Sequence, residues 1–544
     1  MNRLFGCSFL FFIIFSFGAN AQEDTTGGKG WMNMPAVSDT PTVSNAPKTD
    51  SQTYFLYIKD SLKKAAAIED SLKMGVDEKE FIKDNIKALC SKGMHGRGYV
   101  KDGWDSAAKY VLKKFREFKL KPVVAGGPYA QGFAFPVNTF PGKMDLYING
   151  DSMKPGYDFL IDASSPSFVT DSFKKLKVKK INLDKISDTA AWATKIRSMD
   201  SSHAYYLTNI ESLCEKLDLR KDQLLAQLPG GCFIIPQENK LTWAVHRELI
   251  AATVFYVKED SLPRKVKYVS VNVNAVYNPH QRSENIIACV PGKVKDTFVV
   301  FTAHYDHLGM MGNKTVFPGA SDNASGTAML LYLASYFAKN PQYYSILFIA
   351  FGAEEASLMG SEFYVWHPFV PLKNIKFLTN IDIMGDATNG ITVVNATENI
   401  PQFTLLEQIN EKEKYLRTIY PRENAANSDH YYFTKTHVPS FFIYSNGGNG
   451  YYHDIYDVRT ALSLNHVEGV ARLLIDFVGE LKNVPATNPA TPKENITPPT
   501  EMTAPPKDGT VSPEEPSPKP KEEEPSPKPK EEEPSPKPEE TPEK

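Results

Sequence analysis

Between residues 280 and 482 the sequence repeats one unit, which consists of an apolar run, a short loop and a run with helical spacing. Four apolar runs have the composition of strands buried on both faces: TFVVFTAH, YYSILFIAF, IKFLTNID and VPSFFIYS. Three runs between or after them have the spacing of amphipathic helices: TAMLLYLASYFA, LEQINEKEKY and LNHVEGVARLLIDFVGELK. Strands that alternate with helices predict an α/β fold, with a mostly parallel mixed sheet and helices on both faces.

The rest of the 544-residue chain divides by composition and periodicity. FIKDNIKALC and SAAKYVLKKFREF have helical spacing, and two extended runs, YAQGFAFPVN and KVKYVSVNVNAVY, flank a stretch of mixed short elements. After residue 484, repeats of PSPKPKEEE leave too little apolar surface for a core. We predict, in chain order, a signal peptide (1–21), a flexible leader (22–53), an N-terminal helical part of the main domain (54–141), an inserted α/β or mainly β domain (142–262), the main catalytic domain (263–483) and a disordered Pro/Glu/Lys-rich tail (484–544).

The first residues have the pattern of a signal for export. Arg3 precedes the apolar run LFGCSFLFFIIFSF, and Ala19-Asn20-Ala21 has the small residues that a signal peptidase reads. We therefore expect cleavage after Ala21, a secreted or periplasmic protein and no stable membrane span after cleavage. An N-terminal membrane anchor is the alternative.

Cysteines and charge limit the interpretation further. Four cysteines follow the predicted cleavage site: Cys90, Cys214, Cys232 and Cys289. In an oxidising compartment they can pair, with Cys214 and Cys232 as one plausible pair, or they can be buried thiols. The formal net charge of −3 gives no reason to expect binding to nucleic acid.

Ionisable residues stand where the predicted strands end. His304 ends TFVVFTAH, and Asp306, two residues later, points the same way in an extended chain, so it can hold the second imidazole nitrogen. Asp322 stands in the loop before a helix, a place that also suits a helix cap. Ser325 and Gly326 are small enough to let that helix pack closely behind the loop. Reactive groups gather at such strand ends in open α/β sheets.

Two adjacent acids, Glu354 and Glu355, follow the apolar strand SILFIAF. Neighbouring carboxylates after a buried strand each need a cation or a proton. We expect Glu355 to bind metal and Glu354 to accept a proton from metal-bound water. Asp382 ends IKFLTNID in the same way, and His453 follows VPSFFIYS through the flexible GGNG segment.

This set of two histidines and four acids comes from five separate segments. Oxygen-rich sites with one or two imidazoles suit zinc, with manganese or cobalt as substitutes. Two ions about 3.5–4 Å apart can share a water and polarise a carbonyl together. We predict two Zn²⁺ ions with Asp322 as the bridge. His304 and Asp382 would complete one ion, and Glu355 and His453 the other.

The order of six motifs resembles that of the co-catalytic di-zinc aminopeptidases, the family of secreted bacterial leucyl aminopeptidase and aminopeptidase S: HYD, PGASDNASGTA, FGAEEASLMGS, NIDIMGD, SDHYYF and YYHDIYD. The resemblance covers about residues 280–480, and HGRGYVKDGWDSAAKYVLKKF at 95–115 is similar to the N-terminal helix region of that family. It implies the zinc exopeptidase fold of phosphorylase/hydrolase-like architecture.

The resemblance also implies a role for individual residues. Five match the metal ligands of the family: His304, Asp322, Glu355, Asp382 and His453. Glu354 matches the general base, Asp306 its supporting acid, and Tyr452 a position that steadies the oxyanion in some members. Asp429 falls in a motif that shapes the site. Residues 142–262 lie where many relatives carry a protease-associated insert.

These features predict a secreted or periplasmic zinc-dependent exopeptidase. The expected reaction is hydrolysis of N-terminal residues from peptides by a metal-bridging water, with Glu354 as general base. The expected partners are peptides with a free N-terminus, and the partner of the tail stays open. Alternatives on related scaffolds are a glutaminyl cyclase, a carboxypeptidase that acts on acidic C-termini, and a receptor-like relative without catalysis.

Overall fold

A computed structural model describes residues 77–484 of the chain, apart from 171–174 and 239. The predicted signal peptide (1–21) and leader (22–53), the beginning of the predicted helical part (54–76) and the tail from residue 485 lie outside the described residues. Among the described helices, none combines the length and the apolar character needed to cross a membrane.

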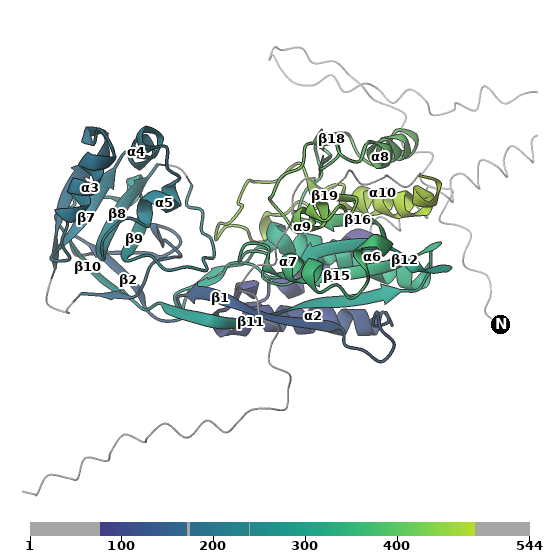
Figure 1. The fold of residues 1–544 in the computed structure, drawn as a ribbon. Helices are drawn as coiled ribbons and strands as arrows, with labels where there is room; N and C mark the ends of the chain where they lie inside the picture. Colours follow the sequence, from purple (N-terminus) through teal and green to yellow (C-terminus); the bar gives the residue numbers. More distant parts are fainter. Residues whose placement is uncertain (1–76, 171–174, 239, 485–544) are drawn as a thin grey trace, which may run out of the picture. The chain divides into compact units, whose positions relative to one another are not determined.

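An eight-stranded mixed sheet forms the centre of the main domain (Figure 1). Across the sheet the strands are β1 (Ala130–Thr139), β11 (Val276–Val290), β15 (Tyr344–Phe351), β12 (Val294–His304), β16 (Ile375–Ile381), β19 (Ser440–Ser445), β17 (Ile391–Val394) and β18 (Ile419–Arg422). β15, β12, β16 and β19 run parallel, whereas β11 is antiparallel to β15 and β17 to β19. The sheet confirms the predicted α/β class, with the four apolar runs as its parallel centre.

Helices cover both faces of this sheet. Successive residues of a strand point to opposite faces, so neighbouring residues belong to different cores. Phe301 and Phe348 belong to the core on one face, which also contains residues of α2, α6 and α10. Val300 and Leu347 belong to the core on the other face, with residues of α7 and α9. A first helical segment covers residues 77–89, and the later main-domain α-helices are α2 (Gly103–Glu117), α6 (Gly326–Lys339), α7 (Met359–Trp366), α8 (Ile400–Glu413), α9 (His430–Lys435) and α10 (Val467–Glu480).

A second sheet, of nine strands, lies between β1 and β11 in the sequence and forms the inserted region. Its strands are β2 (Met144–Ile148), β3 (Asp151–Met153), β4 (Phe159–Ile161), β5 (Phe168–Val169), β6 (Leu176–Asn182), β7 (His203–Thr208), β8 (Gly231–Gln237), β9 (Ala252–Lys258) and β10 (Tyr268–Val273). Its helices are α3 (Thr189–Arg197), α4 (Ile210–Leu217) and α5 (Lys221–Leu225). The inserted region is therefore α/β, and its last strand lies beyond residue 262, where the sequence suggests a boundary.

The four cysteines in the described residues are free thiols. Cys232 lies on β8 and is fully buried, whereas Cys214 lies on α4 and is partly buried. The pair suggested by their proximity in sequence is therefore not formed. Burial raises the pKa of Cys232 to about 12, so the thiol stays protonated and inert.

A short hairpin of the main domain, β13 (Gly309–Met311) and β14 (Thr315–Phe317), packs against the inserted region. One apolar core contains Phe140 and Trp243 together with Met311, Phe317 and Ile455. Trp243 stacks on Phe317 with ring centroids 4.8 Å apart. This core therefore contains residues of both sequence regions.

Candidate metal centre

Five segments bring ionisable side chains to the carboxyl edge of the parallel strands. His304 is the last residue of β12, and Asp382 directly follows β16. Glu354 and Glu355 follow β15 after a two-residue link, and His453 lies in the loop after β19. Asp322 lies in a π-helical turn, Ala320–Ser325, that leads directly into α6. Parallel strands end at one edge, so residues far apart in sequence meet there.

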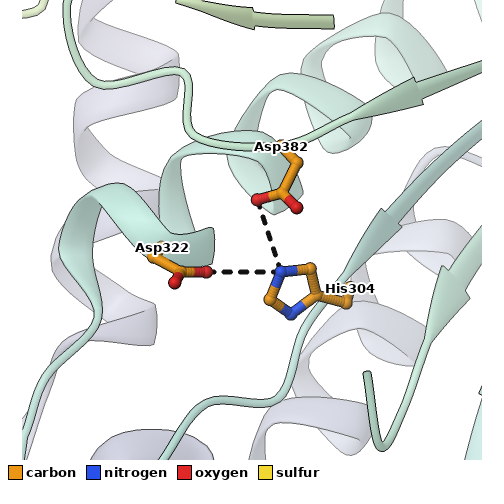
Figure 2. A group of neighbouring side chains, drawn as sticks. All are labelled: His304, Asp322 and Asp382. Carbon is orange, nitrogen blue, oxygen red and sulfur yellow. Dashed lines mark ion pairs between the residues drawn. The ribbon is translucent and has the colours of Figure 1, made fainter. Parts of the chain in front are cut away.

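Asp322 contacts both imidazoles of the predicted ligand set. His304 Nε2 lies 3.3 Å from Asp322 Oδ1 and 3.3 Å from Asp382 Oδ1 (Figure 2). His453 Nε2 lies 3.1 Å from Asp322 Oδ2 and 3.1 Å from Glu355 Oε2. The two oxygens of one carboxylate thus face two different groups of ligand atoms, which is the arrangement that a bridging carboxylate needs.

The donor set fits divalent cations. His304, Asp322 and Asp382 each offer a nitrogen or oxygen within 4.8 Å of the others, and so do His307, Asp322 and Glu355. The Oδ1 atom of Asp382 is buried and accepts no hydrogen bond. Buried carboxylate oxygens without donors are costly unless a cation meets them, and mixed imidazole and carboxylate sites suit zinc.

The cluster contains more acidic than basic side chains. Burial alone would lower the pKa of His304, but the carboxylates of Glu354 and Asp382 raise it well above its ordinary value. At His453 the surrounding carboxylates likewise overcome burial and raise the pKa to about 11. Burial would raise the pKa of Asp322, yet its hydrogen bonds with the two imidazoles hold it well below the ordinary value. A positive charge placed between these side chains would therefore be stabilised, and metal ions would supply that charge.

The two adjacent glutamates differ although both are buried. Burial would raise the pKa of Glu355, but the imidazoles of His453 and His307 lower it to about 2. Burial raises the pKa of Glu354 well above its ordinary value, and the charge of Glu355 adds to that effect against the attraction of His304. Glu355 is thus held as an anion, whereas Glu354 is able to carry a proton.

The carboxylate of Asp306 lies beside the imidazole of His304, as expected, and also makes a second contact. The Nδ1 atom of His304 lies 3.2 Å from the backbone carbonyl of Asp306 and 3.7 Å from its carboxylate. The carboxylate also accepts hydrogen bonds from the backbone N–H groups of Glu354 (3.1 Å) and Glu355 (3.3 Å). Asp306 holds the turn that carries the two glutamates.

Tyr452 and Asp429, the two remaining predicted residues, lie beside the cluster. The ring of Tyr452 stacks on that of His453 with centroids 3.8 Å apart, and half of the tyrosine (51%) is exposed to solvent. Asp429 is buried at the start of α9, and burial raises its pKa to about 7 against the attraction of His304. The neighbouring hydroxyl of Ser428 donates to Asp382 at 2.8 Å.

His307 belongs to the cluster although sequence reasoning assigned it no role. Its side chain is fully buried, and its Nδ1 lies 2.7 Å from Glu355 Oε1. The loop of Asp322 crosses closely over its ring, and Gly319 adopts a left-handed φ of +57° at that crossing. A side chain at residue 319 would overlap the imidazole. The HYDH spacing is the signal that could have pointed to this residue.

Arg97 and Asp457 hold the loop of Asp322 from two sides. Arg97 is fully buried and its guanidinium donates to backbone carbonyls of Leu89, Tyr305, Pro318, Gly319 and Asp322. Asp457 accepts hydrogen bonds from the backbone N–H groups of Ser321 (2.8 Å) and Asp322 (3.1 Å). Both residues lie in segments that resemble the family, HGRGYV and YYHDIYD, but only the folded chain reveals their partners.

Comparisons with known proteins agree with this geometry. Residues 285–478 match the sequence profile of Peptidase family M28. Aminopeptidase YwaD of Bacillus subtilis is 40% identical over 109 residues, which are 20% of this chain and 23% of that protein. A probable leucine aminopeptidase of Arthroderma otae is 28% identical over 218 residues, covering 37% of this chain and 58% of the relative. The chain thus aligns with less than two thirds of the length of these relatives.

Solved structures share the fold over a longer stretch. A zinc aminopeptidase from Bacillus subtilis, BSAP, is similar with a TM-score of 0.56 and 19% identity, covering 75% of this chain and 95% of that one. An aminopeptidase from Aneurinibacillus sp. strain AM-1 is similar with a TM-score of 0.52 and 18% identity, covering 77% and 96%. At these identities the likeness establishes a common fold.

Proposed function

We propose that this chain, whose residues 285–478 belong to peptidase family M28, is a zinc-dependent exopeptidase that removes N-terminal residues from peptides. One observation carries the proposal: the carboxylate of Asp322 faces His304 at 3.3 Å with one oxygen and His453 at 3.1 Å with the other. Relatives described as zinc aminopeptidase and leucine aminopeptidase support the same activity.

We further propose that two zinc ions occupy the centre. Asp322 would bridge them, with His304 and Asp382 on one ion and His453 and Glu355 on the other, in keeping with the contacts on each side. When bound, the ions would polarise the scissile carbonyl and lower the pKa of a water molecule. His307 would orient Glu355 through the contact to its second oxygen.

Glu354 would move the protons of the reaction. Its carboxylate lies 3.9 Å from His304 Nε2, and its raised pKa suits a group that takes a proton from the attacking water and returns it to the leaving amine. Asp306 would keep this glutamate in place through the backbone N–H of the turn. Tyr452, half exposed beside His453, would donate to the oxyanion.

A screen of peptides tests the proposed activity. Protein with a counted zinc content would be assayed on aminoacyl substrates, N-blocked peptides and peptides with a C-terminal glutamate, with and without a chelator. We expect cleavage of substrates with a free N-terminus and loss of that cleavage on chelation. Cleavage confined to C-terminal glutamate, cyclisation of N-terminal glutamine or inactivity of the zinc-loaded protein would each contradict the proposal.

We also propose that the protein is exported. The support is the arrangement of Arg3, the apolar run after it and Ala19-Asn20-Ala21. N-terminal sequencing of protein recovered from outside the cytoplasm should begin at Gln22. Recovery of unprocessed chain in the cytoplasm would contradict export without affecting the peptidase proposal.

A further inference from the structure

A segment of the inserted region, residues 240–246, contacts the loop that carries His453. The backbone N–H of Trp243 donates to the carbonyl of His453 at 3.1 Å, and the Nδ1 of His453 lies 2.9 Å from the carbonyl of Trp243. The ammonium of Lys240 donates to the carbonyl of Gly450 at 2.8 Å and also to that of Tyr452. Four hydrogen bonds thus join this segment to residues 450–453.

Trp243 is itself held firmly on both sides. It is buried, its ring stacks on Phe317 of β14, and its indole N–H donates to the carbonyl of Ile161 at the end of β4 at 2.9 Å. These contacts tie the tryptophan to the main domain through its ring and to the inserted sheet through its nitrogen. Its backbone carbonyl is therefore a fixed acceptor for the imidazole.

We propose that Trp243 and Lys240 are positioning residues for His453, so that the inserted region completes the metal centre. This inference rests on the proposed function, since it concerns one of the proposed zinc ligands. An imidazole that donates from Nδ1 to the Trp243 carbonyl keeps the lone pair of Nε2 free toward Asp322 and Glu355.

The same loop also acts on the opposite side of the cluster. Asp457, four residues after His453, holds the backbone N–H groups of Ser321 and Asp322. A shift of residues 450–453 would move His453 directly, whereas Asp322 is also held by the guanidinium of Arg97, which donates to its carbonyl and to that of Gly319. His304 is part of β12 and would keep its place. The effect of releasing the loop should fall on the ion of His453 and Glu355.

Replacement of Lys240 by methionine tests the proposal in the full-length protein. Lys240→Met keeps the length of the side chain and removes two hydrogen bonds to the loop, whereas Lys240→Arg retains a donor. Lys221→Met is the matched control, because Lys221 lies in the inserted region and contacts Glu211 at 3.6 Å and the ring of Tyr256 at 4.5 Å. Zinc affinity is measured by stepwise titration of chelator-treated protein, and visible absorption of the cobalt-substituted protein reports the geometry of each site.

We expect Lys240→Met to weaken binding of one zinc equivalent by roughly tenfold, the lower end of what loss of a supporting contact costs a metal site. The other equivalent should bind as before, the cobalt spectrum should change, and Lys240→Arg should restore most of the affinity. Unfolding of the metal-free variants should match that of the wild type.

Two outcomes would overturn the inference. If Lys240→Met binds both zinc equivalents as tightly as the wild type and Lys221→Met, the loop does not need the inserted region, and the peptidase proposal stands. If both equivalents weaken together, the segment supports the fold rather than His453. A wild-type protein that binds no zinc would instead refute the proposed function and this inference with it.

Discussion

The two histidines of the candidate metal centre are held in opposite ways. His304 closes strand β12, its side chain is 1% exposed, and its Nδ1 meets the backbone carbonyl of Asp306, two residues away. His453 lies in a loop, its side chain is 12% exposed, and its Nδ1 meets the carbonyl of Trp243, 210 residues away. The half of the centre that contains His304 and Asp382 is built by regular secondary structure. The half that contains His453 and Glu355 depends on a tertiary contact.

This difference has consequences for stability of the two halves. A side chain at the end of a central strand moves only if the sheet moves, because the strand is hydrogen-bonded on both sides. A loop is held by the contacts that its few residues make, and local opening of such segments costs less than global unfolding. If the centre holds the two proposed zinc ions, variants that affect one half should weaken the binding of one ion more than that of the other.

The largest effect is expected from loss of the residue that the two halves share. Asp322→Ala removes the carboxylate between His304 and His453, so both ions should be lost and peptidase turnover should fall to background. Metal analysis after dialysis and a fixed-concentration peptide assay measure both effects. Asp296→Ala, at an exposed position of β12, is the control. Two tightly bound zinc ions in Asp322→Ala would show that the carboxylate is no bridge.

Glu354→Gln should leave both halves intact while turnover is lost. The substitution removes the group proposed to carry protons but none of the five proposed ligands, so kcat should fall by about 10²–10⁴-fold at unchanged zinc content. Steady-state kinetics on zinc-counted protein measure the change. Wild-type kcat in this variant would exclude Glu354 as the general base.

The half of the centre that contains His304 and Asp382 could be predicted from the sequence. Apolar runs that finish in His304 and Asp382 predict strands, and the parallel order predicts that their ends meet. The sheet and both core faces agree with that reading. Local pattern is sufficient here because the side chains are placed by the strands on which they lie.

The half that contains His453 could not be predicted from the sequence in this way. No periodicity in the sequence links Trp243 to His453. No local pattern indicates that the guanidinium of Arg97 donates hydrogen bonds to the backbone carbonyls of Gly319 and Asp322. Contacts of this kind depend on loop paths, which follow from the packing of the whole chain.

His307 offers a test confined to the half of the centre that contains His453 and Glu355. His307→Gln removes the imidazole that contacts Glu355 at 2.7 Å, so the affinity for one zinc equivalent should fall by roughly 10–100-fold while the other persists. Isothermal titration of the metal-free protein with zinc resolves the two steps. His203→Gln, on β7 of the inserted region, is the control. Equal losses in both steps would mean that His307 supports the centre as a whole.

The smallest effect concerns the pH dependence of the metal-free protein. The pKa of His453 rises from an ordinary 6.5 to about 11 in the folded chain, mainly through carboxylates that overcome burial. A raised pKa means that the folded state binds the proton more tightly than the unfolded state. The stabilising contribution is thus complete below pH 6.5 and is lost as the pH rises through about 11.

Chelator-treated protein should accordingly lose a few degrees of Tm as the pH rises across this window, and the loss should be smaller in His453→Asn, which lacks the contribution of His453. Thermal unfolding at stepped pH measures both. Zinc-loaded protein is the control, because an imidazole nitrogen that binds metal holds no proton to lose and its Tm should not follow the same course. An equal slope in wild type and His453→Asn would show that protonation of His453 does not stabilise the loop, and that its position depends on the contacts with Trp243 and Lys240 alone.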